Sequence, residues 1–262
     1  MIKTGLVSIT LRNFSVYEIV NLVKKSGLDG IEWSGGDIHV PEGDTLKASE
    51  ARILCEENGI DISSYGSYYR AGYSEKEALS FSSVMDCACE MGASTIRVWA
   101  GQEGSKKISP QMRGDVVSDL HRIADYAKKQ NISITLEYHN GTLTDNDESV
   151  RKLMQELDAT NILFSWQPPL GFSKTECSNC LETILPKLGN IHVFQWGIDK
   201  DGKLLRLPLE KGRSEWLHYF SKIKQKATNN PQCYAMLEFV IGDSPEQFLK
   251  DAITLKQMMN YV

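Results

Sequence analysis

The chain has neither a long apolar run nor an excess of positive charge. A helix that crosses a membrane needs about 18 consecutive apolar residues, and no run of that length occurs among the 262 residues. A nucleic-acid partner requires a basic face, whereas the formal net charge is −5. The chain opens on a strand pattern instead of an apolar leader. We therefore expect a cytoplasmic protein with no membrane and no nucleic acid among its partners.

Cysteine and glycine motifs are equally sparse. Six cysteines in a chain of this length do not form the pattern of a disulfide framework. Cys177 and Cys180 have the spacing of a redox or zinc motif, but no second pair completes a tetrahedral site. They also fall in a segment with a helical pattern, so we interpret the pair as incidental. No G-x-G-x-x-G follows the first strand pattern, which disfavours a doubly wound open sheet.

What the chain does contain is a regular alternation of short apolar runs and amphipathic segments. The apolar runs are typical of strands buried on both faces, and the amphipathic segments predict helices, several of which end at a glycine. The predicted strands span residues 5–10, 29–33, 60–65, 94–100, 132–136, 161–167, 190–195 and 233–240. The predicted helices span residues 16–25, 45–58, 74–91, 109–130, 145–157, 175–187, 212–226 and 244–260.

Eight strands that are each followed by a helix predict an α/β fold, a single (β/α)8 TIM barrel. No composition shift marks a linker, so one domain over residues 1–262 is expected. Loops at 34–44, 66–73 and 197–206 are expected to determine specificity. Reactive groups of this fold lie at the carboxyl ends of the strands. The polar residues at those ends are the candidate site residues: Glu32, Arg97, Glu137, His139, Gln167, His192 and Glu238.

Glu238 gives the strongest indication of a metal ion. It lies between Leu237 and Phe239 in an apolar strand, and burying an unpaired carboxylate costs several kcal/mol. A cation shared with Glu137 and His192 would balance it. With the amide of Gln167 these groups form a mostly oxygen ligand set, which predicts one divalent ion: Mn, Mg, Co or Zn.

Glu137 and His139 lie two residues apart at the end of one predicted strand. The period of two places both side chains on the same face. A carboxylate and an imidazole that leave one strand end together indicate a metal site or an acid–base pair.

Several segments resemble the sugar phosphate isomerase/epimerase superfamily of xylose isomerase-like TIM barrels, along essentially the whole chain. They include Gly30-Ile-Glu-Trp33 and Pro208-Leu-Glu-Lys-Gly-Arg-Ser-Glu-Trp216. The family holds one metal with a Glu, an Asp, a His and a Glu on strands five to eight. The resemblance implies that Glu137, His192 and Glu238 are the first, third and fourth of these ligands.

Two segments, 96–105 and 136–145, look most similar to the branch that contains bacterial 3-dehydroshikimate dehydratases. In that branch the histidine two residues after the strand-five glutamate acts on the substrate, which implies that His139 is a base. The sixth strand departs from the family pattern, because Gln167 stands where the family has Asp and the following His is absent. Phe194 also replaces the lysine that often follows the strand-seven histidine.

The leading hypothesis from the sequence is a metal-dependent isomerase or epimerase. Its substrate would be a small polyhydroxylated carbonyl compound, a keto-sugar or sugar phosphate. Glu137 and Glu238 would hold the metal and exchange the proton beside the carbonyl through a stabilised enediolate, with His139 as a further catalytic residue. Glu32, Arg97 and Arg213 are expected to bind the substrate.

Two alternatives stay open at this stage: a lyase of the 3-dehydroshikimate dehydratase type, and a non-catalytic sugar-binding barrel with a degraded metal site. A homodimer is a further expectation, because the aromatic residues of the predicted loops fit either a pocket or a partner surface. These aromatics are Tyr65, Tyr68, Tyr69 and Tyr73.

Overall fold

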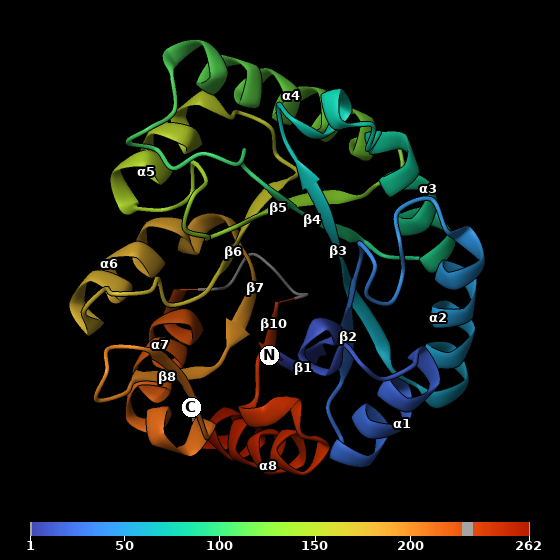
Figure 1. Cartoon of the computed structure of the whole chain (residues 1–262), viewed down its shortest axis with the longest axis vertical. Helices are drawn as coiled ribbons and strands as arrows, with labels where there is room; N and C mark the ends of the chain where they lie inside the picture. Colours follow the sequence, from blue (N-terminus) through green and yellow to red (C-terminus); the bar gives the residue numbers. More distant parts are fainter. Residues whose placement is uncertain (1, 227–232, 262) are drawn as a thin grey trace.

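A computed structural model describes residues 2–226 and 233–261. Its eight central strands are all parallel and close into a barrel in the order β1-β10-β7-β6-β5-β4-β3-β2 (Figure 1). The strands are β1 (Lys3–Val7), β2 (Gly30–Ser34), β3 (Asp61–Arg70), β4 (Thr95–Trp99), β5 (Ser133–Glu137), β6 (Ile162–Trp166), β7 (Leu188–Val193) and β10 (Tyr234–Leu237). The predicted (β/α)8 barrel is thus confirmed.

Helices form the outer ring around this barrel (Figure 1). They are α1 (Val16–Ser26), α2 (Thr45–Asn58), α3 (Phe81–Met91), α4 (Pro110–Lys128), α5 (Asp147–Glu156), α6 (Lys174–Ile184), α7 (Arg213–Lys226) and α8 (Pro245–Tyr261). The caps explain several of the boundaries. Ser15 and Glu18 form a reciprocal capping box at the start of α1, and Gly27 ends it with a left-handed φ of 67°.

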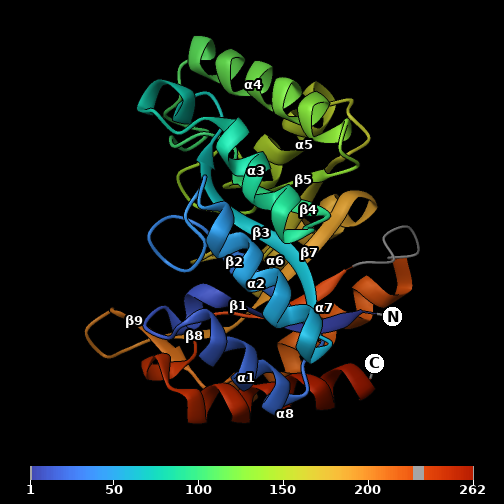
Figure 2. The same ribbon diagram turned by 90° about the vertical axis from the view of Figure 1, so that its right-hand side faces the viewer.

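Two segments that the sequence predicts as loops are ordered strands. β3 continues to Arg70, because Tyr65 and Tyr69 are fully buried while Gly66 and Tyr68 face the barrel axis. Within the predicted loop 197–206, the structure has the antiparallel hairpin of β8 (Gln195–Ile198) and β9 (Leu204–Leu207). Gly202 at φ 79° helps to close its turn. The hairpin projects beyond the barrel (Figure 2).

Three short 3-10 segments correct predicted boundaries. β1 ends at Val7 and is followed by η1 (Ser8–Leu11), where the sequence predicts continued strand. η2 (Ser74–Glu77) is separate from α3, because Ala78 turns the chain with a left-handed φ of 67°. α6 ends at Ile184, and η3 (Leu185–Lys187) contains the proline that ends the regular helix. η4 (Leu209–Gly212) and η5 (Ile241–Asp243) precede α7 and α8.

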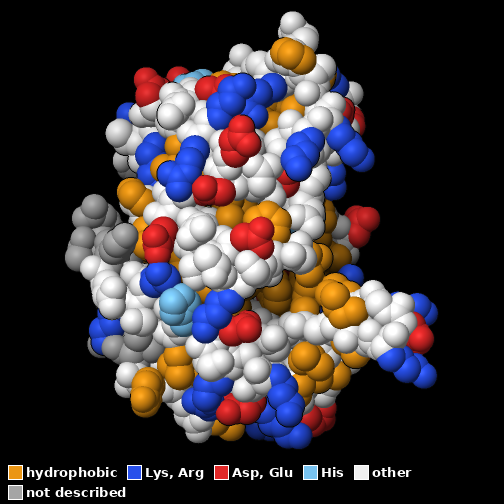
Figure 3. Space-filling view, turned by 90° about the vertical axis from the view of Figure 1, so that its left-hand side faces the viewer, with side chains coloured by type: hydrophobic (Ala, Val, Ile, Leu, Met, Phe, Trp, Pro, Cys, Tyr) orange, Lys and Arg blue, Asp and Glu red, His pale blue; other side chains and the backbone are white. Residues whose placement is uncertain are grey.

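The core surrounds the barrel between strands and helices, and it includes both cysteines of the C-x-x-C pair, which are buried in α6. All six cysteines are free thiols. Hydrophobic side chains also gather on the surface at the base of the projecting hairpin (Figure 3). Within the described ranges, no helix combines the length and hydropathy required to traverse a membrane.

Candidate metal centre and active site

Five ionisable side chains converge inside the carboxyl end of the barrel. Glu32 lies on β2, Arg97 on β4, Glu137 on β5 and His192 on β7, and Glu238 directly follows β10. None is more than 5% exposed. Residues from five different strands therefore meet where the sequence places the site, as expected at the carboxyl face of this fold.

The imidazole of His192 lies among the three carboxylates. Its Nε2 is 3.5 Å from a Glu32 oxygen, and its Nδ1 is 3.6 Å from Glu137 Oε1 and 3.4 Å from Glu238 Oε2. Arg97 bridges two of the same acids, at 3.4 Å from Glu32 and 3.1 Å from Glu137. Gly66 leaves room for this bridge, because an added Cβ would lie 2.9 Å from both Arg97 and Glu32.

The charges in the cluster shift one another's pKa values. Burial acts to raise the pKa of Glu32, but His192 and Arg97 outweigh it and lower the pKa to about 2. Burial likewise opposes ionisation of Glu137, yet Arg97 and His192 hold its pKa below the usual value. For His192, burial is outweighed by Glu238 and Glu32, which raise its pKa well above the ordinary value.

Glu137, His192 and Glu238 fit a divalent metal ion. One ligand atom from each lies within 4.8 Å of the others. Both ring nitrogens of His192 and Oε2 of Glu238 are buried without a hydrogen-bond partner among the described residues, and an unsatisfied buried polar atom costs roughly 1–3 kcal/mol. With a neutral imidazole, three carboxylates and one guanidinium leave two negative charges, which one divalent cation would balance.

Gln167 lies beside the triad but presents its amide nitrogen to it. The nitrogen donates to Glu137 Oε1 at 3.2 Å and to the carbonyl of Tyr138 at 2.8 Å. Both neighbours are acceptors, so this orientation of the amide is the one that satisfies them. In this arrangement Gln167 holds the Glu137 carboxylate in place, whereas the sequence predicts that its oxygen is a fourth ligand.

His139 is exposed at the rim, just beyond Glu137. Its Nδ1 is 2.7 Å from the carbonyl oxygen of Asn140. A carbonyl only accepts, so Nδ1 donates to it, and Nε2 has no hydrogen-bond partner among the described residues. His139 also contacts the ring of Trp99, at a centroid distance of 5.5 Å.

One cavity residue, Trp99, is absent from the sequence-based candidates, and Tyr68 is expected there only as an aromatic of a pocket or partner surface. The indole nitrogen of Trp99 donates to Glu137 Oε2 at 2.5 Å, and Tyr68 packs edge-on against the same indole. Trp99 follows Arg97 by two residues, the same period that links Glu137 to His139, so strand alternation would have identified it. Of the four tyrosines expected at a pocket or partner surface, Tyr68 is the one that lines the cavity.

The cavity has a polar floor and mainly aromatic walls. Its side chains beyond the triad include Tyr68, Arg97, Trp99, His139, Gln167, Phe194, Trp196 and Phe239. Phe239 adopts a left-handed φ of 54°, and its N–H donates to the Thr10 hydroxyl. This strained turn directly follows Glu238, and such strain persists where the surrounding structure holds it.

Arg213 does not join the site. Its guanidinium donates to the Glu210 carboxylate at 2.7–2.9 Å and to the Gln257 side chain at 2.8 Å. It is absent from the residues that line the central cavity. The substrate-binding role predicted from the resemblance is therefore not matched by its position.

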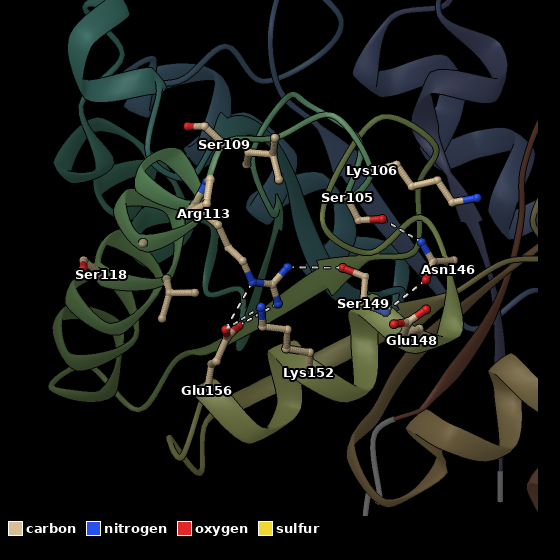
Figure 4. A pocket seen from close by; sticks show the side chains of 14 residues that line it. Ser105, Lys106, Ser109, Arg113, Ser118, Asn146, Glu148, Ser149, Lys152 and Glu156 are labelled. Atoms are coloured by element: carbon tan, nitrogen blue, oxygen red, sulfur yellow. Dashed lines mark hydrogen bonds and ion pairs between the residues drawn. The ribbon is translucent and has the colours of Figure 1, made fainter.

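A second hollow lies outside the barrel, in the groove between α4 and α5 (Figure 4). Arg113 reaches into it but is paired with Glu156 at 2.7 Å and lies 3.4 Å from the Ser149 hydroxyl. Asn146 donates to Ser105 at 2.7 Å. The polar groups that Figure 4 joins by dashed lines satisfy one another.

A closed parallel barrel with a buried carboxylate–imidazole cluster at the carboxyl ends of its strands is a TIM barrel with a candidate metal site. The chain belongs to the xylose isomerase-like TIM barrel family, whose model matches residues 20–253.

A curated relative, the 3-dehydroshikimate dehydratase of Bacillus anthracis, is 28% identical over 166 residues, which cover 61% of this chain and 59% of that protein. The chain therefore matches less than two thirds of that relative's length. The crystal structure of the probable 3-DHS dehydratase AsbF from the same organism has a TM-score of 0.76 at 19% identity, over 97% of this chain and 99% of that one.

A xylose isomerase-like TIM barrel protein from Mycobacterium smegmatis, solved in complex with magnesium, has a TM-score of 0.70 at 16% identity. The likeness covers 96% of this chain and 91% of that one. At these identities both solved structures demonstrate the shared fold.

Proposed function

We propose that the protein is a divalent-metal-dependent lyase that removes water from a small polyhydroxylated carbonyl compound of the 3-dehydroshikimate type. The observation that carries this proposal is the Nε2 of His139, which has no partner among the described residues, at the rim of a cavity lined by Glu137 and Glu238 of the triad. A neutral imidazole with a free nitrogen is a suitable base near neutral pH. The relative from Bacillus anthracis bears the same activity in its name.

The triad and Arg97 would bind the metal and the substrate, and His139 would transfer the proton. The triad would hold the metal, which when bound polarises the carbonyl and so acidifies the adjacent C–H bond. Nε2 of His139 takes that proton, a C=C bond forms from the C–H electron pair, and the C–O bond to the departing hydroxyl breaks. His139 passes the same proton to the departing hydroxyl, which leaves as water and restores the neutral imidazole. Arg97 supplies positive charge beside the substrate oxygens.

A second candidate is the isomerase or epimerase favoured by the sequence. It requires Glu137 or Glu238 to exchange protons with the substrate. Glu137 is poorly suited, because Trp99, Gln167 and Arg97 already engage its two oxygens. Glu238 Oε2 has no hydrogen-bond donor among the described residues, and this favours Glu238 as the proton carrier of that alternative.

The test is turnover of 3-dehydroshikimate by Mn²⁺-loaded protein, followed by the absorbance of the catechol product. His139→Gln is expected to lower kcat by about 10²–10⁴-fold, the usual contribution of a general base, while bound metal stays at the wild-type level. A His139→Gln variant as active as the wild type would sink the assignment. Epimerisation of a ketohexose without any catechol product would favour the second candidate. A protein that binds no metal after reconstitution supports the non-catalytic alternative.

A further inference from the structure

Two of the nine arginines differ from the rest. Seven form ion pairs with carboxylates: Arg52, Arg97, Arg113, Arg122, Arg151, Arg206 and Arg213. Arg12 and Arg70 have no carboxylate partner in the described part of the chain. The two unpaired guanidinium groups both belong to segments beside the cavity, next to Tyr68.

Arg70 is the last residue of β3 and is paired in register with Trp99. Its guanidinium carbon lies 4.6 Å from the Trp99 ring centroid, and the side chain is half-buried. Stacking occupies one face of a planar guanidinium and leaves its five N–H donors directed outward from the edge. Since Trp99 lines the cavity, Arg70 presents unused donors beside its wall.

Arg12 directly follows η1, beyond the carboxyl end of β1, and is exposed. Its charge reaches Tyr68: burial raises the pKa of this tyrosine, and Arg97 and Arg12 oppose that rise. Tyr68 lies two residues before Arg70 on β3. Arg70 lies on the strand of Tyr68, and Arg12 directly follows η1, whose Ile9 also lines the cavity, so the two arginines belong to two separate segments that border the cavity.

The buried floor of the cavity and the segments that border it at Tyr68 carry charges of opposite sign. The floor carries three carboxylates against Arg97, and Glu137 and Glu238 line the cavity itself. The side near Tyr68 carries two unpaired cations, while Phe194, Trp196 and Phe239 form apolar wall elsewhere. A neutral sugar carries no charge that could pair with the two guanidinium groups. A substrate with an anionic group at one end and its reacting carbonyl at the other matches this polarity.

We infer that Arg70, assisted by Arg12, forms an anion subsite that binds the carboxylate or phosphate of the substrate while the carbonyl end reaches the triad. The inference rests on the proposed function and names the residues that would hold the anionic group of its substrate. Arg70 offers a bidentate fork for either group. Arg12 adds long-range attraction, which weakens as salt is added.

The experiment compares ligands that differ only in the anionic group. Calorimetry on Mn²⁺-loaded protein measures 3,4-dihydroxybenzoate against catechol, and fructose 6-phosphate against fructose. The first pair tests a carboxylate and the second a phosphate. Arg70→Gln is expected to weaken binding of the preferred anion by roughly tenfold or more, the loss of a charge-assisted hydrogen bond. Binding of the matching neutral ligand should change by less than about twofold, and Arg12→Gln should give a smaller effect.

Arg151→Gln is the matched control, because Arg151 is an exposed arginine paired with Asp147 on α5. The subsite is overturned if Arg70→Gln weakens the binding of anionic and neutral ligands equally. It is also overturned if Arg70→Gln and Arg151→Gln bind the anionic ligand with equal affinity. If the wild type binds neither 3,4-dihydroxybenzoate nor catechol, the proposed function is contradicted. The comparison of fructose 6-phosphate with fructose then remains as a separate test of the subsite. If that pair then shows no preference for the phosphate, the subsite is overturned as well.

Discussion

The cavity inside the barrel and the groove between α4 and α5 differ in how their charges are neutralised. The groove is the larger of the two, about 650 Å³ against about 160 Å³. Its cation Arg113 is satisfied by Glu156 and Ser149. The inner cavity instead lies over His192 and Glu238, whose buried ring nitrogens and Oε2 lack hydrogen-bond partners within residues 2–226 and 233–261. Unsatisfied buried groups, and not volume, distinguish the candidate site.

The difference follows from where each hollow lies in the fold. The groove is formed by two helices that pack side by side, and their polar residues pair across it as on any helical surface. Strand ends, in contrast, force inward side chains from β2, β4, β5 and β7 into one small volume. Arg97 and His192 offset part of the negative charge of the carboxylates, but Glu238 Oε2 has no hydrogen-bond partner among the described residues. The cavity therefore keeps unsatisfied groups, whereas those of the groove pair with one another.

The largest expected effect contrasts one glutamate from each hollow. Glu238→Gln removes an anionic ligand, so metal affinity is expected to fall by on the order of 100-fold or more, and turnover with it. Metal analysis after dialysis, together with the catechol assay, measures both. Glu156→Gln is the control, because it removes the ion pairs of the outer groove with Arg113 and Lys152 and should leave metal content unchanged. If Glu238→Gln retains stoichiometric metal and turnover, the inner cavity is not a metal site.

A second prediction compares the stability of metal-free wild type and metal-free Glu32→Gln as a function of pH. The pKa of Glu32 is lowered to about 2 in the folded chain, so its ionised form stabilises the fold. That contribution is fully present above the unfolded pKa near 4.3 and is lost as pH falls towards 2. Urea unfolding of wild type and Glu32→Gln should differ by on the order of 3 kcal/mol at pH 5.5. The difference should shrink steadily to pH 2.5, and a constant difference would contradict the assignment.

The strand-end logic explains how much was predictable. Eight apolar runs predict the barrel, and barrel geometry alone brings Glu32, Arg97, Glu137, His192 and Glu238 together. No contact information is needed for that step, because parallel strands end at one face. The same logic fails for Arg213, which lies on the first turn of α7, where orientation depends on helix packing and on Glu210.

The other differences between prediction and structure concern residues whose role depends on the direction of a hydrogen bond or on the length of a strand. The sequence predicts correctly that Gln167 lies beside Glu137. The direction of its amide depends on the Tyr138 carbonyl, which accepts from the nitrogen, so that the nitrogen faces Glu137. β3 extends past its predicted end because Tyr65 and Tyr69 are buried against the helical layer. Tertiary packing of this kind overrides local turn preferences, and it places Arg70 against Trp99, which lines the cavity.

The smallest expected effect compares glycines in the two hollows. Gly66→Ala puts a Cβ 2.9 Å from both Arg97 and Glu32, so the buried ion pair must shift, at a cost of roughly 1–3 kcal/mol. Gly114 lies in the interior of α4 and lines the outer groove, and an added Cβ meets nothing within 4 Å. Gly114→Ala should therefore stabilise the protein by about 0.4–1 kcal/mol, because alanine favours helix and loses less backbone entropy. Thermal unfolding measures the change in stability of each variant relative to wild type, and the two changes should have opposite signs. If both variants are stabilised, the inner cavity tolerates a methyl group as the groove does.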